Sequence, residues 1–115
     1  MARVVAYVPD LMFGSKVLAA LSAAGHDVTL VSTLDAAAAA AAGADALVAD
    51  LASGDIDGPA LIAALPVPAP KTLACYAHVE ADARTAAQDA GFDLVVPRSR
   101  LHREGAELVA GLLAS

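Results

Sequence analysis

The sequence contains few cysteines and few aromatic residues. Among its 115 residues there is one cysteine, Cys75, no tryptophan, two tyrosines and two phenylalanines. A single cysteine excludes a disulfide bond within the chain and fits a reducing compartment, so we expect a cytoplasmic protein. Because aromatic residues are only 3% of the chain, the core must consist mainly of Val, Leu, Ile and Ala.

Positive charge and long apolar runs are also scarce. Seven Lys and Arg residues stand against thirteen Asp and Glu residues, which gives a net charge of −6. A nucleic-acid surface needs a concentrated basic face, so we expect no nucleic-acid partner. No apolar run reaches the length of a membrane span, so we expect no membrane partner either. The length predicts a single domain over residues 1–115, and the excess of alanine is typical of a GC-rich bacterial genome.

Apolar runs alternate with helical patterns along the whole chain. Arg3–Val8 is a continuous β-branched run, as expected for a strand that is buried on both faces. Leu11–Ala24 predicts a helix that ends at Gly25. The capping-box spacing of Ser32–Asp35 predicts the start of a second helix, over Ala36–Ala42. The remaining predicted strands are Val28–Val31, Asp45–Asp50, Thr72–Tyr76 and Leu94–Val96, and the remaining predicted helices are Pro59–Leu65, Ala81–Ala90 and Arg103–Leu113.

This alternation predicts an α/β fold, with a parallel sheet that is covered by helices on both faces and joined by right-handed crossovers. Ligands of such sheets bind outside the carboxyl ends of the strands. The polar residues expected at that edge are therefore the candidates for a functional site: Asp10, Asp50, His78, Arg98 and Ser99.

The spacing of several acidic, glycine and basic residues resembles that of a response-regulator receiver domain (CheY-like). In receivers an acidic residue ends the third strand, five residues after another acid and eight residues before a glycine, as do Asp50, Asp45 and Gly58 here. Receivers also place a basic residue seven positions after a later glycine, where this chain has Arg98 after Gly91. The resemblance extends over nearly the full length of the chain.

The resemblance implies a three-layer, doubly wound (βα)5 flavodoxin-like fold. It implies a five-stranded parallel sheet in the order 2-1-3-4-5 and a role in two-component signalling. It also implies that Asp50 occupies the phosphoacceptor position.

Three positions depart from the receiver pattern. Receivers bind Mg²⁺ with a pair of acids after the first strand, but this chain has Pro9 and Asp10 there. Tyr76 replaces the small hydroxyl residue that ends the fourth strand, and Arg98 replaces the lysine. Arginine keeps the charge but offers a planar fork of donors instead of a point charge. These departures imply a degenerate receiver (pseudo-receiver), in which Asp50 is a vestigial phosphoacceptor and no cofactor is bound.

Two interpretations of Asp50 remain open. In the first, its carboxylate caps the following turn and pairs with a nearby cation such as Arg98 or Lys16. In the second, Asp50 is a functional phosphoacceptor, or it binds a cation together with Asp10, which would be a thin ligand set for Mg²⁺.

An anion or a small molecule is the alternative ligand of this edge. Ser15 and Lys16 lie near the start of a predicted helix, where free N–H groups and the helix dipole favour negative charge. Arg98, Ser99 and His78 would complete such a site, because a histidine can titrate near neutral pH. In the other interpretation Lys16 is only solvated while Phe13 packs against the end of the first strand.

The sequence offers no candidate for enzyme chemistry. Cys75 lies within a predicted strand and is expected to be a buried core residue. No nucleophile–base pair and no metal-ligand set can be named from spacing, so we expect no enzyme. The leading hypothesis is a receiver-like domain that binds a protein partner or a second copy. The resemblance implies that its surface is the face formed by Thr72–Tyr76, Ala81–Ala90, Leu94–Val96 and Arg103–Leu113, which receivers use for dimers and output contacts. The basic cluster Pro97–Arg103 either meets an acidic partner or a phosphate, or is a solvated helix start that Glu104 and Glu107 balance.

Overall fold

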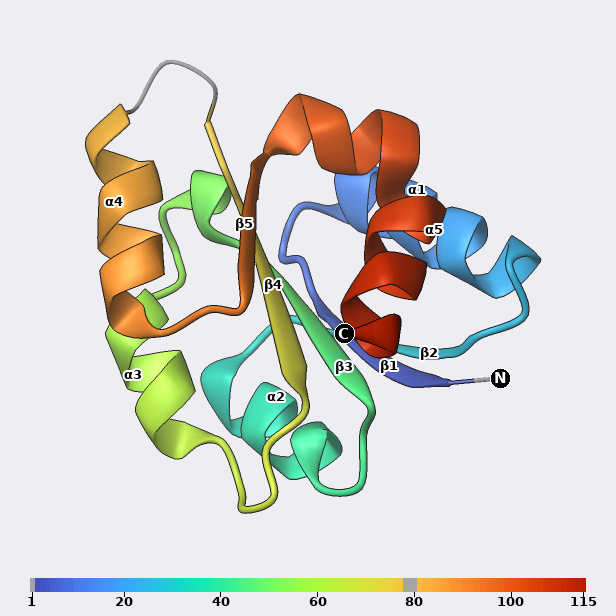
Figure 1. Cartoon of the computed structure of the whole chain (residues 1–115), viewed down its shortest axis with the longest axis horizontal. Coiled ribbons are helices and arrows are strands. Elements are labelled where there is room, and N and C mark those ends of the chain that lie inside the picture. The colour runs from blue at the N-terminus through green and yellow to red at the C-terminus, as the bar shows by residue number, and fades with distance from the viewer. Residues whose placement is uncertain (1, 78–80) are drawn as a thin grey trace.

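Strands and helices alternate along the chain in the computed structural model, which describes residues 2–77 and 81–115 (Figure 1). The strands are β1 (Arg3–Tyr7), β2 (Asp27–Val31), β3 (Ala46–Asp50), β4 (Lys71–Tyr76) and β5 (Leu94–Pro97). The helices are α1 (Leu11–Ala23), α2 (Leu34–Ala41), α3 (Gly58–Ala64), α4 (Ala81–Ala90) and α5 (Arg98–Ala114), and a 3₁₀ turn, η1 (Leu51–Ser53), follows β3.

The strands form one parallel sheet in the order β2-β1-β3-β4-β5. In the register between β3 and β4, Asp50 lies opposite Cys75, and in the register between β4 and β5, Tyr76 lies opposite Pro97. The predicted α/β fold and strand order are therefore confirmed. Because every strand runs in the same direction, all carboxyl ends meet at one edge of the sheet.

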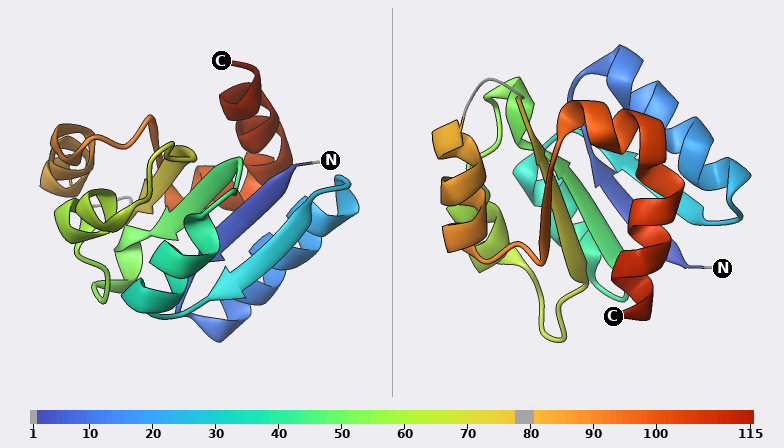
Figure 2. Two further views of the ribbon diagram at one scale, coloured as in Figure 1. Left: turned by 90° about the horizontal axis from the view of Figure 1, so that it is seen from below. Right: turned by 45° about the horizontal axis from the view of Figure 1, so that its top comes forward.

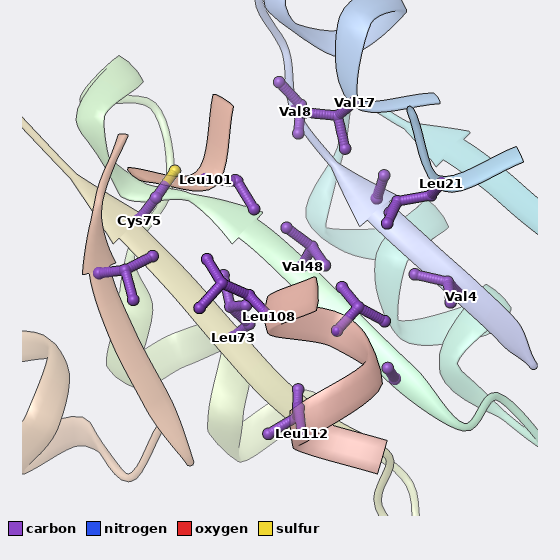
Figure 3. Close-up of a cluster of buried hydrophobic side chains, with 14 of the residues drawn as sticks. Val4, Val8, Val17, Leu21, Val48, Leu73, Cys75, Leu101, Leu108 and Leu112 are labelled. Carbon is purple, nitrogen blue, oxygen red and sulfur yellow. The ribbon is translucent and has the colours of Figure 1, made fainter. Parts of the chain in front are cut away.

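Helices cover both faces of the sheet, which gives the fold three layers (Figures 1 and 2). Helices α1 and α5 lie side by side on one face, and α2, α3 and α4 cover the other. Alternate residues of each strand supply two separate cores. Val48, Leu73 and Cys75 pack toward α1 and α5 (Figure 3), whereas Leu47 and Ala74 belong to the core under α2, α3 and α4.

Helix α5 begins earlier than the sequence predicted. It starts at Arg98, directly after β5, and not at Arg103. The backbone leaves helical geometry at Glu104 (φ −127°, ψ 20°), so α5 has a first segment before this kink and a longer segment after it. The first segment is mostly polar, which hides its helical pattern in the sequence. Its one buried apolar residue, Leu101, packs in the core between α1 and α5.

The predicted N-cap of the alanine-rich helix was wrong by one residue, and the helix begins at Leu34, two residues before the predicted run Ala36–Ala42. The side chain of Thr33, and not that of Ser32, caps α2 by accepting a hydrogen bond from the N–H of Ala36 at 3.1 Å. A threonine at this position satisfies one of the free N–H groups of the first turn, so either hydroxyl residue would have fitted the pattern. Within the described residues, no helix has the length and apolar character of a membrane span.

Candidate functional site

Asp50 is the last residue of β3, and its side chain is completely buried. Its Oδ1 accepts hydrogen bonds from the N–H of Ala52 at 3.0 Å and from the thiol of Cys75 at 3.3 Å. The first contact caps the η1 turn. The second follows from the sheet register, which places Cys75 beside Asp50 on the neighbouring strand. One oxygen of this carboxylate is thus occupied by two donors from the chain itself.

Asp10 approaches the same place from α1. It is the N-cap of that helix, and its Oδ1 accepts hydrogen bonds from the N–H groups of Met12 at 2.9 Å and Phe13 at 3.1 Å. A carboxylate at this position also opposes the positive end of the helix dipole. The cap fixes the direction of the second oxygen, Oδ2, which remains available for another partner.

Arg98 connects the two carboxylates. Its Nη2 lies 3.0 Å from Asp10 Oδ2, as a hydrogen bond, and 3.0 Å from Asp50 Oδ2, as an ion pair without hydrogen-bond geometry. The guanidinium carbon lies 4.1 Å from the centre of the Phe13 ring, within the range of a cation–π contact. Because Arg98 is the first residue of α5, this one side chain links the starts of α1 and α5 to the end of β3.

These contacts decide the protonation states of two members of the cluster. The N–H of Phe13, and after it the guanidinium of Arg98, lower the pKa of Asp10, so this carboxylate remains ionised. Burial raises the pKa of the Cys75 thiol, and the nearby Asp50 carboxylate raises it further. The thiol therefore keeps its proton and donates a hydrogen bond to Asp50. A buried, protonated thiol is a poor nucleophile, which agrees with the predicted core role of Cys75.

The residues at this edge do not fit the Mg²⁺ ion that receivers bind. Magnesium requires several oxygen ligands in near-octahedral geometry. Here the free oxygens of Asp10 and Asp50 share one guanidinium nitrogen, which already supplies the positive charge between them. Within residues 2–77 and 81–115, no group of three or more His, Cys, Asp or Glu side chains is arranged to hold a metal ion.

The other predicted site residues are divided between this cluster and other places. Lys16 and Ser99 line the same shallow depression as Asp10 and Arg98. Tyr76 is buried at the end of β4, next along the strand from Cys75, and strand alternation turns it toward the opposite face of the sheet. Ser15 is exposed on α1. His78 lies outside the described residues.

The N–H groups at the start of α1 are partly occupied. The carboxylate of Asp10 accepts from those of Met12 and Phe13. An anion that used these two N–H groups would have to displace the Asp10 cap, and the anion site predicted around Ser15 and Lys16 stays a prediction. The structure also reveals two contacts that the sequence did not predict, the thiol of Cys75 on Asp50 and the ring of Phe13 under Arg98. The sequence held a signal for the contact between Cys75 and Asp50, because Asp50 ends one predicted strand and Cys75 is the last residue but one of the next predicted strand.

Comparison with known proteins identifies the fold. No family model matches the sequence, and no similar sequence was found among curated proteins. Solved structures of receiver domains, however, superpose closely on the chain. A response regulator from Thermotoga maritima is 18% identical, with a TM-score of 0.81 over 100% of this chain and 99% of that one.

Two further solved structures show the same likeness. A predicted response regulator from Chloroflexus aurantiacus is 21% identical, with a TM-score of 0.85 over 99% of this chain and 98% of that one. The receiver domain of the Francisella response regulator 1452 is 16% identical, with a TM-score of 0.82 over 99% of this chain and 98% of that one. The chain therefore has the flavodoxin-like fold of CheY-like receiver domains.

Proposed function

We propose that the chain is a receiver-like signalling domain that acts by binding a protein partner and does not depend on Mg²⁺-assisted phosphorylation of Asp50. The observation that carries this proposal is the position of the Arg98 guanidinium, 3.0 Å from both Asp10 Oδ2 and Asp50 Oδ2. Phosphoryl transfer needs a cation that neutralises charge as it develops, and an open carboxylate oxygen. In this arrangement a fixed side chain occupies the space between the carboxylates.

The burial of Asp50 supports the same proposal. A phosphodonor must reach one of its oxygens, yet the side chain is 0% exposed, and both oxygens face groups of the chain itself. The surrounding contacts resemble those of a structural ion pair. Asp50 would then hold the η1 turn and the start of α5 in place, and the domain would be a non-enzymatic binding module.

A surface around β5 is the proposed site for the partner. Strand β5 lies at the edge of the sheet, and its residues Leu94 and Val95 are only half-buried. A depression of about 320 Å³ next to it is lined by Leu94, Leu108 and Leu112 together with the acidic residues Asp93 and Glu107. Apolar residues at an unpaired sheet edge favour contact with another protein or with a second copy of this chain.

Treatment with a small phosphodonor tests the signalling proposal. The chain should be incubated with acetyl phosphate and Mg²⁺ and analysed as an intact protein by mass spectrometry, with an active receiver domain treated in parallel. We expect no added phosphoryl group on this chain while the control is modified. A phosphoryl group that appears on the wild type and is lost in Asp50→Asn would contradict the proposal.

Variants of the sheet edge test the partner surface. Gly111→Glu places a charge in the depression beside β5, at an exposed position where a side chain meets no neighbour, and Ala23→Glu places the same charge at the exposed end of α1, as a matched control. We expect self-association in sedimentation equilibrium, or recovery of a specific partner from the native cell, to be reduced by Gly111→Glu and unchanged by Ala23→Glu. An equal effect of both variants, or of neither, would exclude this surface.

A further inference from the structure

A second site lies between α1 and α5, away from the carboxylates. A cavity of about 290 Å³ is lined by Val17, Ala20 and Leu21 of α1 and by Leu101 and Gly105 of α5. The volume is at the lower end of the range for small-molecule pockets. Lys16 and His102 line this cavity, and they also line the depression of about 330 Å³ beside Arg98, so the two hollows adjoin at these residues.

Small residues keep the cavity open. Ala19 and Ala20 of α1 and Gly105 of α5 all line it, and larger side chains at these positions would fill the space between the helices. Gly105 directly follows the kink at Glu104. A Cβ atom added to Gly105 would meet only Leu101 Cδ1, at the ordinary contact distance of 3.7 Å, so the packing does not demand a glycine there.

Lys16 brings a positive charge to the lining of the cavity, on a protein whose net charge is −6. Helix α1 contains no acidic residue, and its one charged residue is Lys16. Four of the seven basic residues of the chain lie on α1 or in the first segment of α5, namely Lys16, Arg98, Arg100 and Arg103.

The nearby carboxylates are already paired. Asp10, which lines the outer depression, binds Arg98, and Glu104 lies within ion-pair distance of Arg100 and Arg103. Within the part of the chain that the structure describes, Lys16 and His102 have no ion-pair partner. Lys16 and His102 therefore border an apolar cavity whose own lining contains no carboxylate.

We propose that this cavity binds a small amphipathic carboxylate, with its apolar group between α1 and α5 and its carboxylate at Lys16 and His102. The apolar lining provides affinity through burial of the hydrocarbon, and the basic side chains that border the cavity select an anionic head group. The ligand need not touch Asp50 or Arg98, so the site is independent of the fate of the phosphoacceptor position.

Paired probes of equal chain length test both parts of the proposal. Octanoate and octanol share the same hydrocarbon but differ in charge, and amide NMR spectra of the ¹⁵N-labelled chain report where each one binds. We expect octanoate to shift the amides of residues 16–21 and 101–105 in a saturable manner, and octanol to bind more weakly at the same residues. Shifts that are absent at millimolar octanoate, or that lie elsewhere, would overturn the proposal.

Substitutions separate the apolar contribution from the charged one. Ala20→Leu should fill the cavity and abolish the octanoate shifts, whereas Ala110→Leu, on an exposed part of α5 outside the cavity, should leave them unchanged. Ala19→Leu is a second filling variant, and because both alanines are exposed, these chains should fold normally. Undiminished octanoate binding by both filling variants would contradict the assigned location.

Lys16→Gln tests the head-group contact, with Lys71→Gln as the control that removes the same charge from the start of β4. We expect Lys16→Gln to weaken octanoate about two- to fivefold, the range for one exposed charge contact, and to leave octanol unaffected. Equal weakening of both probes, or equal effects of the two lysine variants, would refute the selection of an anion.

Discussion

The aspartates at the two ends of the sheet differ in the partners of their carboxylates. At the amino end, Asp45 and Asp93 each directly precede a strand and accept hydrogen bonds from the neighbouring one. Asp45 Oδ2 accepts from the N–H of Arg3 at 2.8 Å, and Asp93 Oδ2 accepts from the N–H of Thr72 at 2.8 Å and its hydroxyl at 3.1 Å. Their partners are neutral groups of the sheet, so these carboxylates fix the register of strand pairs.

At the carboxyl end, Asp10 and Asp50 also accept N–H groups, but each has a second oxygen that faces Arg98. The carboxylates of Asp45 and Asp93 are thus satisfied by neutral donors of the neighbouring strands. Those of Asp10 and Asp50 require a cation from a distant part of the chain. Because Asp50 is completely buried, loss of that cation would leave a charge without compensation. The carboxyl end of the sheet therefore depends on Arg98.

Removal of Arg98 should have the largest effect. Arg98→Met leaves the Asp50 carboxylate buried and unpaired, and we expect the free energy of unfolding to fall by about 3 kcal/mol, the lower end for broken buried ion pairs. The lower end applies because the Arg98 side chain is 34% exposed. Urea denaturation at pH 7 provides the measurement. A loss below about 1 kcal/mol, typical of a surface ion pair, would refute the role assigned to Arg98.

The combined variant Arg98→Met with Asp50→Asn sharpens this result. Without the buried charge, the cost of losing Arg98 should shrink, and the double variant should recover much of the stability. Additive losses in the double-mutant cycle would mean that Arg98 acts through Phe13 and Asp10 alone.

Removal of Asp93 should have a smaller effect. Asp93→Ala leaves the N–H and hydroxyl of the buried Thr72 without their acceptor, and we expect a loss of about 1–2 kcal/mol in the free energy of unfolding. Because this site lies at the opposite end of the sheet, its effect should add to that of Arg98→Met. Strong coupling between the two variants would contradict the claim that the two ends of the sheet are stabilised independently.

The contribution of Asp10 to the pH dependence of the free energy of unfolding should be smaller again. Its pKa is lowered in the folded protein from the usual value of 3.8, so its contribution to stability is present above that value and is lost as the pH falls through the folded pKa. Asp10→Asn should therefore be less stable than the wild type at pH 7, with the difference disappearing at acidic pH. Urea midpoints at several pH values test this sign, and a constant difference would contradict it.

The smallest expected effect concerns the reactivity of the Cys75 thiol. Since burial raises the pKa of its thiol, a thiol reagent such as iodoacetamide should leave the native chain unmodified at pH 8 and should modify it in urea. Rapid modification of the native chain would show that the carboxyl end opens more readily than its contacts indicate.

Much of the fold was readable from the sequence, because strand and helix periods alternate and the strand order follows from the resemblance to receivers. The position of Asp50 was also readable, since a buried apolar run ends there. The contact between Arg98 and Asp10 could not be predicted, because 88 residues separate the two and the contact depends on how α1 and α5 pack together. The early start of α5 was missed because its first segment buries only Leu101.

The cavity between α1 and α5 was equally invisible in the sequence. Alanines such as Ala19 and Ala20 fit an exposed helix face as well as a pocket lining, and only the packing of α5 across α1 separates the two cases. Local patterns thus located the site residues, whereas their partners were set by tertiary packing.

The most direct test of the account is a Mg²⁺ titration followed by amide NMR. The N–H groups of Met12, Phe13 and Ala52 donate to the two carboxylates and would sense any ion bound there. With Arg98 between Asp10 and Asp50, these amides should not shift in a saturable manner at millimolar Mg²⁺. Saturable shifts at all three, abolished by Asp50→Asn, would show that the carboxylates release Arg98 and bind the metal, and would contradict the account.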